Sequence, residues 1–257
     1  MPEKTEYASG TPAWVDLSTT DPGKAKAFYA EVFGWDYRDD GLERGSSTAL
    51  VDGRAVAGIR QQPPDAPAGW NTNVAVDDVD DVFAMAIDAG ASPNIEPSDV
   101  ADTGRFAAFS DPQGARVLLW QSEAFPGAEL VNEPGAFIWN ELICSDCAGA
   151  SEFYGEVFGW QSQVTPSPDG SEAMMFTGAD GPVGSARDPK SNQIPPTWLV
   201  YFACDDADEC SRAITAAGGA IAIPPIDADF GRMGAAVDAT GAAFAFIATN
   251  PNYGSTA

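Results

Sequence analysis

The pattern of hydrophobic and polar positions near the start of the chain predicts a strand followed by a helix. Residues 14–20 alternate between apolar and polar side chains, which indicates a strand with one face on a core. Asp21 and Pro22 follow, and they suit a helix start because Asp accepts amide hydrogen bonds and Pro fits the first helical position. Apolar residues then recur at helical spacing up to a C-terminal cap at Gly34: Ala25, Phe28, Tyr29 and Val32.

This pattern occurs a second time, 125 positions later. Residues 28–35 read FYAEVFGW and residues 153–160 read FYGEVFGW, with one difference between them. When Trp14 is set against Trp139 and the alignment runs forward without a gap, 11 of 22 positions are identical. Asp146 is then expected to open the matching helix, and Trp35 and Trp160 are expected to be core residues beyond the helix ends.

Each half contains the strand–helix unit once more. Residues 70–90 match residues 198–218, and short strand-like runs follow every predicted helix. The order is therefore one strand, one helix and about three strands, repeated four times. This predicts an α+β protein with four βαβββ modules that form two curled-sheet clefts, with helices on one face of each sheet.

The seam of the duplication predicts the domain organisation. The segment QSEAFPGAELVNEPG at 121–135 has the proline, glycine and charge of a linker. We expect a first domain over residues 1–121, a linker over 122–135 and a second domain over 136–257.

Composition excludes several classes of protein. The chain has 13 basic and 38 acidic residues, and a net charge of −25 disfavours nucleic acid and anionic membranes. It has neither an apolar run of the ~20 residues that span a bilayer nor a signal-peptide pattern, so we expect a cytoplasmic protein. It contains no histidine, which excludes an imidazole base or metal ligand.

Two of the four cysteines form a Cys-x-x-Cys motif, at Cys144 and Cys147. Such a pair can be redox-active or can supply half of a zinc site. No thioredoxin-like βαβ context precedes it, so structurally incidental thiols are the other interpretation.

The repeated motifs resemble those of the vicinal oxygen chelate superfamily, which includes glyoxalase I, bleomycin-resistance proteins and extradiol dioxygenases. The motifs are a strand followed by D-x-x-x-A-x-x-F-Y-x-x-V-F-G-W in each half, D-D-x-D after the later strands, and D-P-x-G before the last strand of the first half. The resemblance covers residues 11–250, and two-domain actinobacterial members are the most similar. It implies a duplicated vicinal-oxygen-chelate fold.

The resemblance also implies a metal held by His and Glu, at positions that can be counted from the motifs. One ligand lies seven residues before each helix-starting Asp, and a Glu lies four residues past a turn Gly. The residues at these positions are apolar, aromatic or amide: Trp14, Asn71, Trp139, Leu199, Leu118 and Ala245. Transition metals need nitrogen, sulfur or carboxylate donors, so we expect no metal and no other cofactor.

Strand alternation places several other residues on the faces where the family holds its metal. Asp16 and Glu141 each follow a Trp by two positions, and a carboxylate that loses hydration beside an indole suits general acid–base chemistry. The alternative is that each is hydrogen-bonded to backbone or arginine and only orders the cleft. The candidate ligand-binding residues are Trp14, Asn71, Asn73, Trp120, Trp139 and Tyr201. Arg105 and Arg232 either clamp an anionic ligand or pair with acidic residues.

The expected function is that of a metal-independent family member that binds an apolar or aromatic small molecule. It would sequester the molecule or act on it by carboxylate acid–base catalysis, as a metal-independent lyase or isomerase. One alternative is a metal-dependent lyase, isomerase or dioxygenase with an atypical site, and another is a protein with closed clefts that acts through its surface. The expected partner is a small-molecule ligand, and the duplication is compatible with a monomer or a homodimer.

Overall fold

The computed structural model describes residues 4–39, 46–166, 172–190 and 194–251. The elements of the first half are β1 (Pro12–Thr19), α1 (Pro22–Phe33), β2 (Asp36–Asp39), β3 (Ser47–Val51), β4 (Arg54–Gln61), β5 (Gly69–Ala75), α2 (Val79–Asp88), β6 (Ser92–Val100), β7 (Gly104–Ser110) and β8 (Arg116–Ser122). Those of the second half are β9 (Phe137–Ile143), α3 (Cys147–Phe158), β10 (Gln161–Pro166), β11 (Glu172–Gly178), β12 (Gly181–Arg187), β13 (Thr197–Ala203), α4 (Ala207–Ala216), β14 (Ala220–Ala228), β15 (Gly231–Val237) and β16 (Ala243–Thr249). One strand, one helix and three strands recur four times, which confirms the predicted βαβββ modules.

Each half of the chain forms its own eight-stranded sheet, with the order β2-β3-β4-β1-β5-β8-β7-β6 in the first and β10-β11-β12-β9-β13-β16-β15-β14 in the second. The first strands of two modules, β1 and β5, pair antiparallel at the centre of the first sheet. Each also runs parallel to the last strand of its own module. The second sheet repeats this arrangement around β9 and β13. The fold is the predicted duplicated α+β fold, with open sheets.

The helix ends have the chemistry that the sequence predicts. The side chain of Asp21 accepts a hydrogen bond from Lys24 N at 2.9 Å, and Pro22 occupies the first helical position. Gly34 ends α1 in the left-handed region at φ 69°, where a side chain is strained. Asp146 caps α3 in the same way, by accepting from Gly149 N at 2.9 Å.

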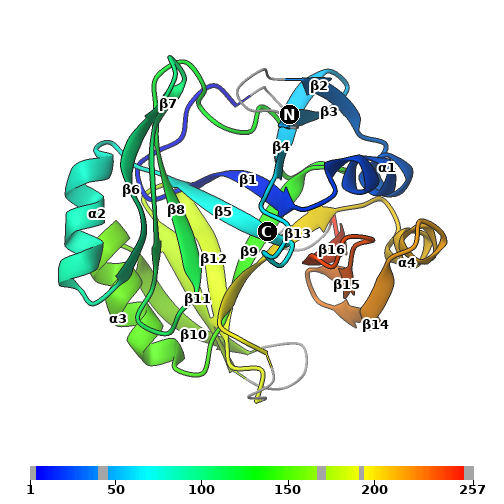
Figure 1. The fold of residues 1–257 in the computed structure, drawn as a ribbon. Coiled ribbons are helices and arrows are strands. Elements are labelled where there is room, and N and C mark those ends of the chain that lie inside the picture. Colours follow the sequence, from blue (N-terminus) through cyan, green and yellow to red (C-terminus); the bar gives the residue numbers. More distant parts are fainter. Residues whose placement is uncertain (1–3, 40–45, 167–171, 191–193, 252–257) are drawn as a thin grey trace.

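The two halves share their hydrophobic cores. Figure 1 shows α2 and α3 side by side on one side of the molecule and α1 and α4 on the other. One core cluster joins the side chains of α1 to those of α4, β13 and β16, and a second joins those of α2 to those of α3 and β11. Each helix therefore covers its own sheet and also packs on a helix of the other half.

The repeated aromatic residues at the helix ends connect the halves directly. The Tyr29 hydroxyl donates to Asp238 Oδ2, and the Tyr154 hydroxyl donates to Asp111 Oδ2, both at 2.9 Å. Trp35 and Trp160 are buried, as predicted, and each indole N–H donates a hydrogen bond of 2.7 Å to a backbone carbonyl. The acceptor of Trp35 is Gly135, at the end of the segment between the sheets, and that of Trp160 is Gly10 in the first half. Each copy of the motif therefore contributes a buried tyrosine that hydrogen-bonds to an aspartate of the other half.

The segment between the sheets packs against the molecule along its length. Ala128 N donates to Ala13 O at 2.8 Å, and Ala55 N donates to Glu129 Oε2 at 2.7 Å. Leu130 and Val131 are buried in the core cluster that contains α1. Residues 123–136 are therefore part of the packed structure rather than a flexible linker, and we call this segment the strap. The domain boundaries themselves remain a proposal, and their outer ends at 1–3 and 252–257 lie outside the described residues.

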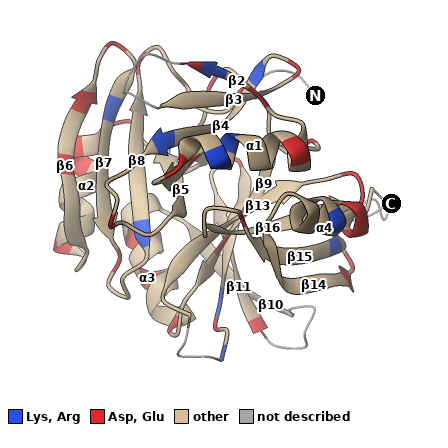
Figure 2. Cartoon of the chain, turned by 45° about the vertical axis from the view of Figure 1, so that its right-hand side comes forward, with Lys and Arg blue, Asp and Glu red and all other residues tan. Residues whose placement is uncertain are grey.

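Acidic residues are distributed over both halves of the molecule, and basic residues are few (Figure 2). Among the described residues, no helix is long and apolar enough to cross a membrane.

Candidate functional site

Apart from Arg105 and Arg232, the candidate residues alternate along their strands with side chains of the helix-packed cores, so they lie on the helix-free face of each sheet. Register places Trp14 beside Asn73 and Asn73 beside Leu118, with Asp16 beside Asn71 in the next row. We call this surface of the first sheet the N face.

The equivalent surface of the second sheet is the C face. There Trp139 lies beside Tyr201, and Tyr201 beside Ala245. Glu141 lies beside Leu199 and Ser185 in the next row. Asp16 and Glu141 therefore occupy equivalent positions on the two faces.

On the N face, Asp16 is held by three polar side chains. Arg60 Nη2 lies 2.6 Å from Oδ1, and Asn71 Nδ2 donates to the same oxygen at 2.9 Å. Asn73 Nδ2 donates to Asp16 Oδ2 at 2.8 Å, and Asp16 is only 6% exposed. Both oxygens of this carboxylate are bonded to protein groups, two amides and one arginine. This favours a structural role for Asp16, in which it orders the face, over acid–base chemistry.

A second arginine, Arg116, is close enough to Asp16 and Arg60 to interact with both through their charges. Loss of hydration and the nearby positive charge of Arg60 lower the pKa of Arg116, and the negative charge of Asp16 opposes this shift. The N face thus combines one carboxylate with two guanidinium groups, a local positive excess in a strongly acidic protein.

The strap covers the two tryptophans of the N face. The Phe125 ring packs edge-on against Trp14, with ring centroids 4.9 Å apart, and lies 6.1 Å from Trp120. Trp120 Nε1 also donates to Phe125 O at 2.8 Å. Trp14 and Trp120, both predicted to bind a ligand, are therefore in contact with the protein's own phenylalanine.

The C face has a different set of partners around its carboxylate. Arg187 Nη2 donates to Glu141 Oε2 at 3.1 Å, and the Tyr201 hydroxyl donates to the same oxygen at 3.0 Å. Burial, reinforced by the charge of Glu141, raises the pKa of Tyr201 well above its ordinary value, so its hydroxyl keeps its proton and remains a donor. Within the described part of the chain, Oε1 of Glu141 has no hydrogen-bond partner.

Around this polar group the C face is apolar. The cluster contains the buried residues Tyr201, Ala245 and Ile247 and the half-buried residues Ile138, Trp139, Leu199, Phe230 and Met233. Trp139 Nε1 donates to Ser185 Oγ at 3.0 Å, which orients the indole across the face. Half-buried apolar side chains around a few polar groups are typical of small-molecule sites.

Arg105 and Arg232 lie away from both faces, among carboxylates. Arg105 Nε donates to Asp80 Oδ2 and its Nη1 to Asp99 Oδ1, both at 2.7 Å. Arg232 Nε donates to Asp208 at 2.9 Å, and its Nη1 donates to Asp227 at 2.9 Å. These ion pairs link β7 to α2 and β15 to α4. They favour the interpretation that both arginines pair with acidic residues over the interpretation that they bind an anionic ligand. Both arginines lie within these strands, one residue after the start of each.

Sequence reasoning missed the two arginines that pair with the central carboxylates. Arg60 and Arg187 lie near the ends of β4 and β12, the strands parallel to β1 and β9. Their segments read VAGIR at 56–60 and VGSAR at 183–187, so aligning these two strands as well would have identified an arginine common to both halves.

The residues present do not fit the metal that the fold family holds. At the six family positions only Asn71 offers an oxygen donor, and its side chain donates to Asp16 and Ser18. Among the described residues there is no group of three or more Cys, Asp or Glu that could hold a metal ion. We therefore derive no chemistry through a metal.

Comparison with known proteins agrees with this fold. The model of the Glyoxalase/Bleomycin resistance protein/Dioxygenase superfamily matches residues 11–119 and 136–246. A protein of Mycobacterium tuberculosis (strain CDC 1551 / Oshkosh), provisionally named glyoxylase CFP32, is 40% identical over 259 residues, which cover 98% of this chain and 99% of that protein. The anthracycline biosynthesis protein DnrV of Streptomyces peucetius is 29% identical over 266 residues, 97% of each chain.

Solved structures share the architecture at low sequence identity. The Mn(II)-bound glyoxalase from Novosphingobium aromaticivorans superposes with a TM-score of 0.68 at 18% identity, over 95% of this chain and 84% of that one. The 2,3-dioxygenase LapB from Pseudomonas sp. KL28 gives 0.62 at 15% identity, over 96% of both chains. The chain belongs to the Glyoxalase/Bleomycin resistance protein/Dioxygenase superfamily.

Proposed function

We propose that the protein binds an apolar, aromatic small molecule on its C face without a metal. The observation that carries the proposal is the combination of half-buried apolar side chains with a single polar group, Glu141 with Arg187 and Tyr201. A flat aromatic ligand would cover Trp139, Leu199 and Met233, and the polar group would fix its orientation.

The name of the Streptomyces relative supports the class of ligand. An anthracycline is a fused-ring aromatic compound with phenolic and carbonyl groups, and DnrV is named for its biosynthesis. We infer that the ligand of this chain is of that class, a fused-ring secondary metabolite or a precursor of one.

Two paired variants test the location of the site. Met233 on the C face and Phe106 on the N face occupy equivalent positions of β15 and β7, and both are half-buried. A fused-ring probe, 1,8-dihydroxyanthraquinone, is titrated against tryptophan fluorescence. A charge placed in the apolar wall by Met233→Asp should weaken binding about tenfold or more, since ~1.4 kcal/mol is a factor of ten, while Phe106→Asp should leave it unchanged. Equal effects of the two variants, or no saturable binding by the native protein, would refute the C-face proposal.

A second candidate function is proton transfer on the bound ligand, with Glu141 as the base. Because its two hydrogen bonds both end on Oε2, Oε1 is left as the oxygen that could take a proton from a ligand. The matched control is Asp16, whose two oxygens are both occupied by protein donors. If the probe or a related compound is turned over, Glu141→Gln should abolish turnover with binding retained, and Asp16→Asn should not. Recovery of unchanged ligand from the native protein would leave sequestration as the function.

Metal independence needs its own measurement. Elemental analysis of protein purified without chelators or a polyhistidine tag should find no stoichiometric transition metal. One equivalent of manganese, iron, nickel or zinc would overturn the proposal in favour of a metal-dependent lyase, isomerase or dioxygenase with Asp16 or Glu141 as ligands.

A further inference from the structure

The Cys-x-x-Cys motif forms a close pair of thiols away from the two faces. Cys144 follows β9 and is buried, whereas Cys147 is the first residue of α3 and is half-buried. Their sulfur atoms are 3.7 Å apart, and Cys144 Sγ donates to Cys147 Sγ. A disulfide needs ~2.05 Å between sulfurs, so a small rotation of the side chains would bring the atoms into bonding distance.

The surroundings make the two thiols unequal. Donation by Cys144 is the largest effect on Cys147 and lowers its pKa, with help from Lys190. Partial burial and the carboxylates of Asp188 and Asp146 oppose this shift. The pKa of Cys144 is raised, first by its bond to Cys147 and then by burial. The amide groups at the start of α3 also favour an anion at Cys147, so Cys147 is the nucleophile and Cys144 retains its proton.

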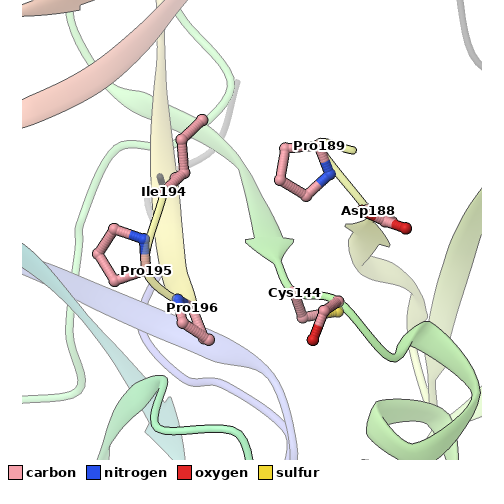
Figure 3. A pocket seen from close by; sticks show the side chains of 7 residues that line it. Cys144, Asp188, Pro189, Ile194, Pro195 and Pro196 are labelled. Carbon is pink, nitrogen blue, oxygen red and sulfur yellow. The ribbon is translucent and has the colours of Figure 1, made fainter. Parts of the chain in front are cut away.

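A cavity of about 220 Å³ opens beside Cys144, whose sulfur lies 3.7 Å from that of Cys147. It is lined by Cys144, Ser145, Asp188, Pro189 and residues 194–196, and Figure 3 shows Cys144 between the two loops that form its walls. This volume lies below the ~300–1,000 Å³ of a drug-sized site, which suits a small organic group rather than a fused-ring ligand. The residues 191–193 between the loops lie outside the described chain and play no part in the argument.

The other half of the protein holds the motif in place. Gln113, in the turn before β8, accepts a hydrogen bond from Asp146 N at 2.9 Å and donates to Asp146 O at 2.8 Å. A loop fixed from both sides keeps the sulfur atoms together. A zinc half-site is disfavoured, because no third ligand stands near the pair among the described residues.

We propose that Cys147 and Cys144 form a thiol–disulfide exchange site for a low-molecular-weight disulfide, whose organic group enters the adjacent cavity. The Cys147 thiolate attacks one sulfur of the small disulfide, forms a mixed disulfide and releases one small thiolate. Cys144 then loses its proton to solvent and attacks Cys147 Sγ, which closes the Cys144–Cys147 disulfide and releases the second small thiol. The protein pair loses two electrons and two protons, and one small disulfide becomes two small thiols.

The chain contains a matched control pair, Cys204 and Cys210, at the start of α4. The pKa of Cys204 is raised by its hydrogen bond to Cys210, by burial and by the adjacent Asp205 and Asp206. Cys144 has a raised pKa for similar reasons, so the pairs differ in their second cysteine. Cys210 is the fourth residue of α4 and its N–H already bonds Asp206 O, whereas Cys147 is the first residue of α3. The second pair should therefore react more slowly.

The test is incubation of the full-length protein with oxidised glutathione, followed by alkylation, peptide mapping and intact-mass measurement. In native protein the Cys144–Cys147 peptide should oxidise at least about tenfold faster than the Cys204–Cys210 pair, because its sulfur atoms lie 3.7 Å apart and Cys147 is at the first position of a helix, where a thiolate is favoured. In a Cys204→Ser/Cys210→Ser background, the mass should fall by two hydrogens. There Cys144→Ser should accumulate one stable glutathione adduct, and Cys147→Ser should accumulate none.

Two results would overturn the proposal. One is equal or faster oxidation of the Cys204–Cys210 pair in native protein, a comparison that requires no variant to fold. The other is adduct formation on Cys147→Ser at the rate of Cys144→Ser, with both variants showing native far-ultraviolet circular dichroism.

Discussion

Removal of one oxygen atom from Tyr29 should test how the halves are joined. The Tyr29 hydroxyl accepts a hydrogen bond from Trp70 Nε1 and donates to Asp238 Oδ2, both at 2.9 Å. The side chain is fully buried, and Asp238 is 4% exposed. Tyr29→Phe keeps the ring and its stacking on Trp35, where the ring centroids are 4.9 Å apart, so packing is preserved. Only the two hydrogen bonds are lost.

The expected loss of stability follows from the two groups left without a partner. A buried donor or acceptor that loses its partner costs about 1–3 kcal/mol. The substitution leaves one indole N–H and one carboxylate oxygen in this state, so we expect a decrease of about 3 kcal/mol or more. This is a large fraction of the roughly 5–15 kcal/mol that stabilises a typical protein.

The assay is urea unfolding followed by tryptophan fluorescence, with two comparisons. Tyr154→Phe should lose about as much as Tyr29→Phe, because Trp198 and Asp111 surround Tyr154 in the same way. Tyr37→Phe is the control, since its half-buried hydroxyl makes one bond, to Lys26 O at 3.0 Å, and should cost about 1 kcal/mol or less. A Tyr29→Phe loss within error of the Tyr37→Phe loss would refute the interpretation of these hydroxyls as the fastening between the halves.

Three further predictions concern stability. Burial raises the pKa of five tyrosines, and three of them are buried in the folded protein: Tyr29, Tyr154 and Tyr201. Above pH ~10 the unfolded chain loses the protons of these three buried tyrosines, whereas the folded protein keeps them. The free energy of unfolding should therefore fall as pH rises, by up to about 1.4 kcal/mol per pH unit for each tyrosine and roughly 4 kcal/mol per pH unit for the three together. Urea titration between pH ~9 and ~11 measures this decrease. Either half expressed alone should expose its share of the joint cores, and should bind a hydrophobic dye and unfold without cooperativity; a cooperative transition would contradict the shared-core description. Gly34→Ala should lower the thermal midpoint, with a cost of about 1 kcal/mol in the left-handed region, whereas Gly23→Ala inside α1 should raise it slightly.

The sequence predicted the parts of this fold that depend on local chemistry. Alternation and helical spacing located the strands and helices, and the caps at Asp21, Gly34 and Asp146 are interactions between residues close in the chain. The internal repeat then supplied the number of modules, and strand alternation with the family resemblance placed Asp16 and Asn71 on ligand-facing strand surfaces. These features need no knowledge of which elements meet in space.

The sequence could not predict contacts that depend on how the halves pack. Nothing in the pattern around Tyr29 indicates that its partner is Asp238, 209 positions away. The burial of Leu130 and Val131 likewise depends on the strap crossing a core to which both halves contribute. The ion pair between Arg60 and Asp16 links parallel strands, and such a pairing is visible only once the sheet order is known.

The two faces place a carboxylate at the same position of the sheet but surround it with different partners. The same row of the sheet carries Asp16 with Arg60 in the first half and Glu141 with Arg187 in the second, so the pair of charges is common to both. On the N face both oxygens of the carboxylate are bonded by amides, and Phe125 covers the neighbouring tryptophan. On the C face the amides are replaced by Leu199 and Tyr201, and both bonds that the described residues make to Glu141 end on Oε2.

This difference is the basis for proposing ligand binding on the C face rather than the N face. A fully bonded buried carboxylate stabilises the particular geometry around it but has no oxygen available for a ligand. A carboxylate bonded on one side and bordered by half-buried apolar groups can meet a ligand that brings its own polar atom to the free oxygen. The N face is therefore best explained as the structural copy and the C face as the copy on which ligand binding is proposed, although both descend from one repeated sequence.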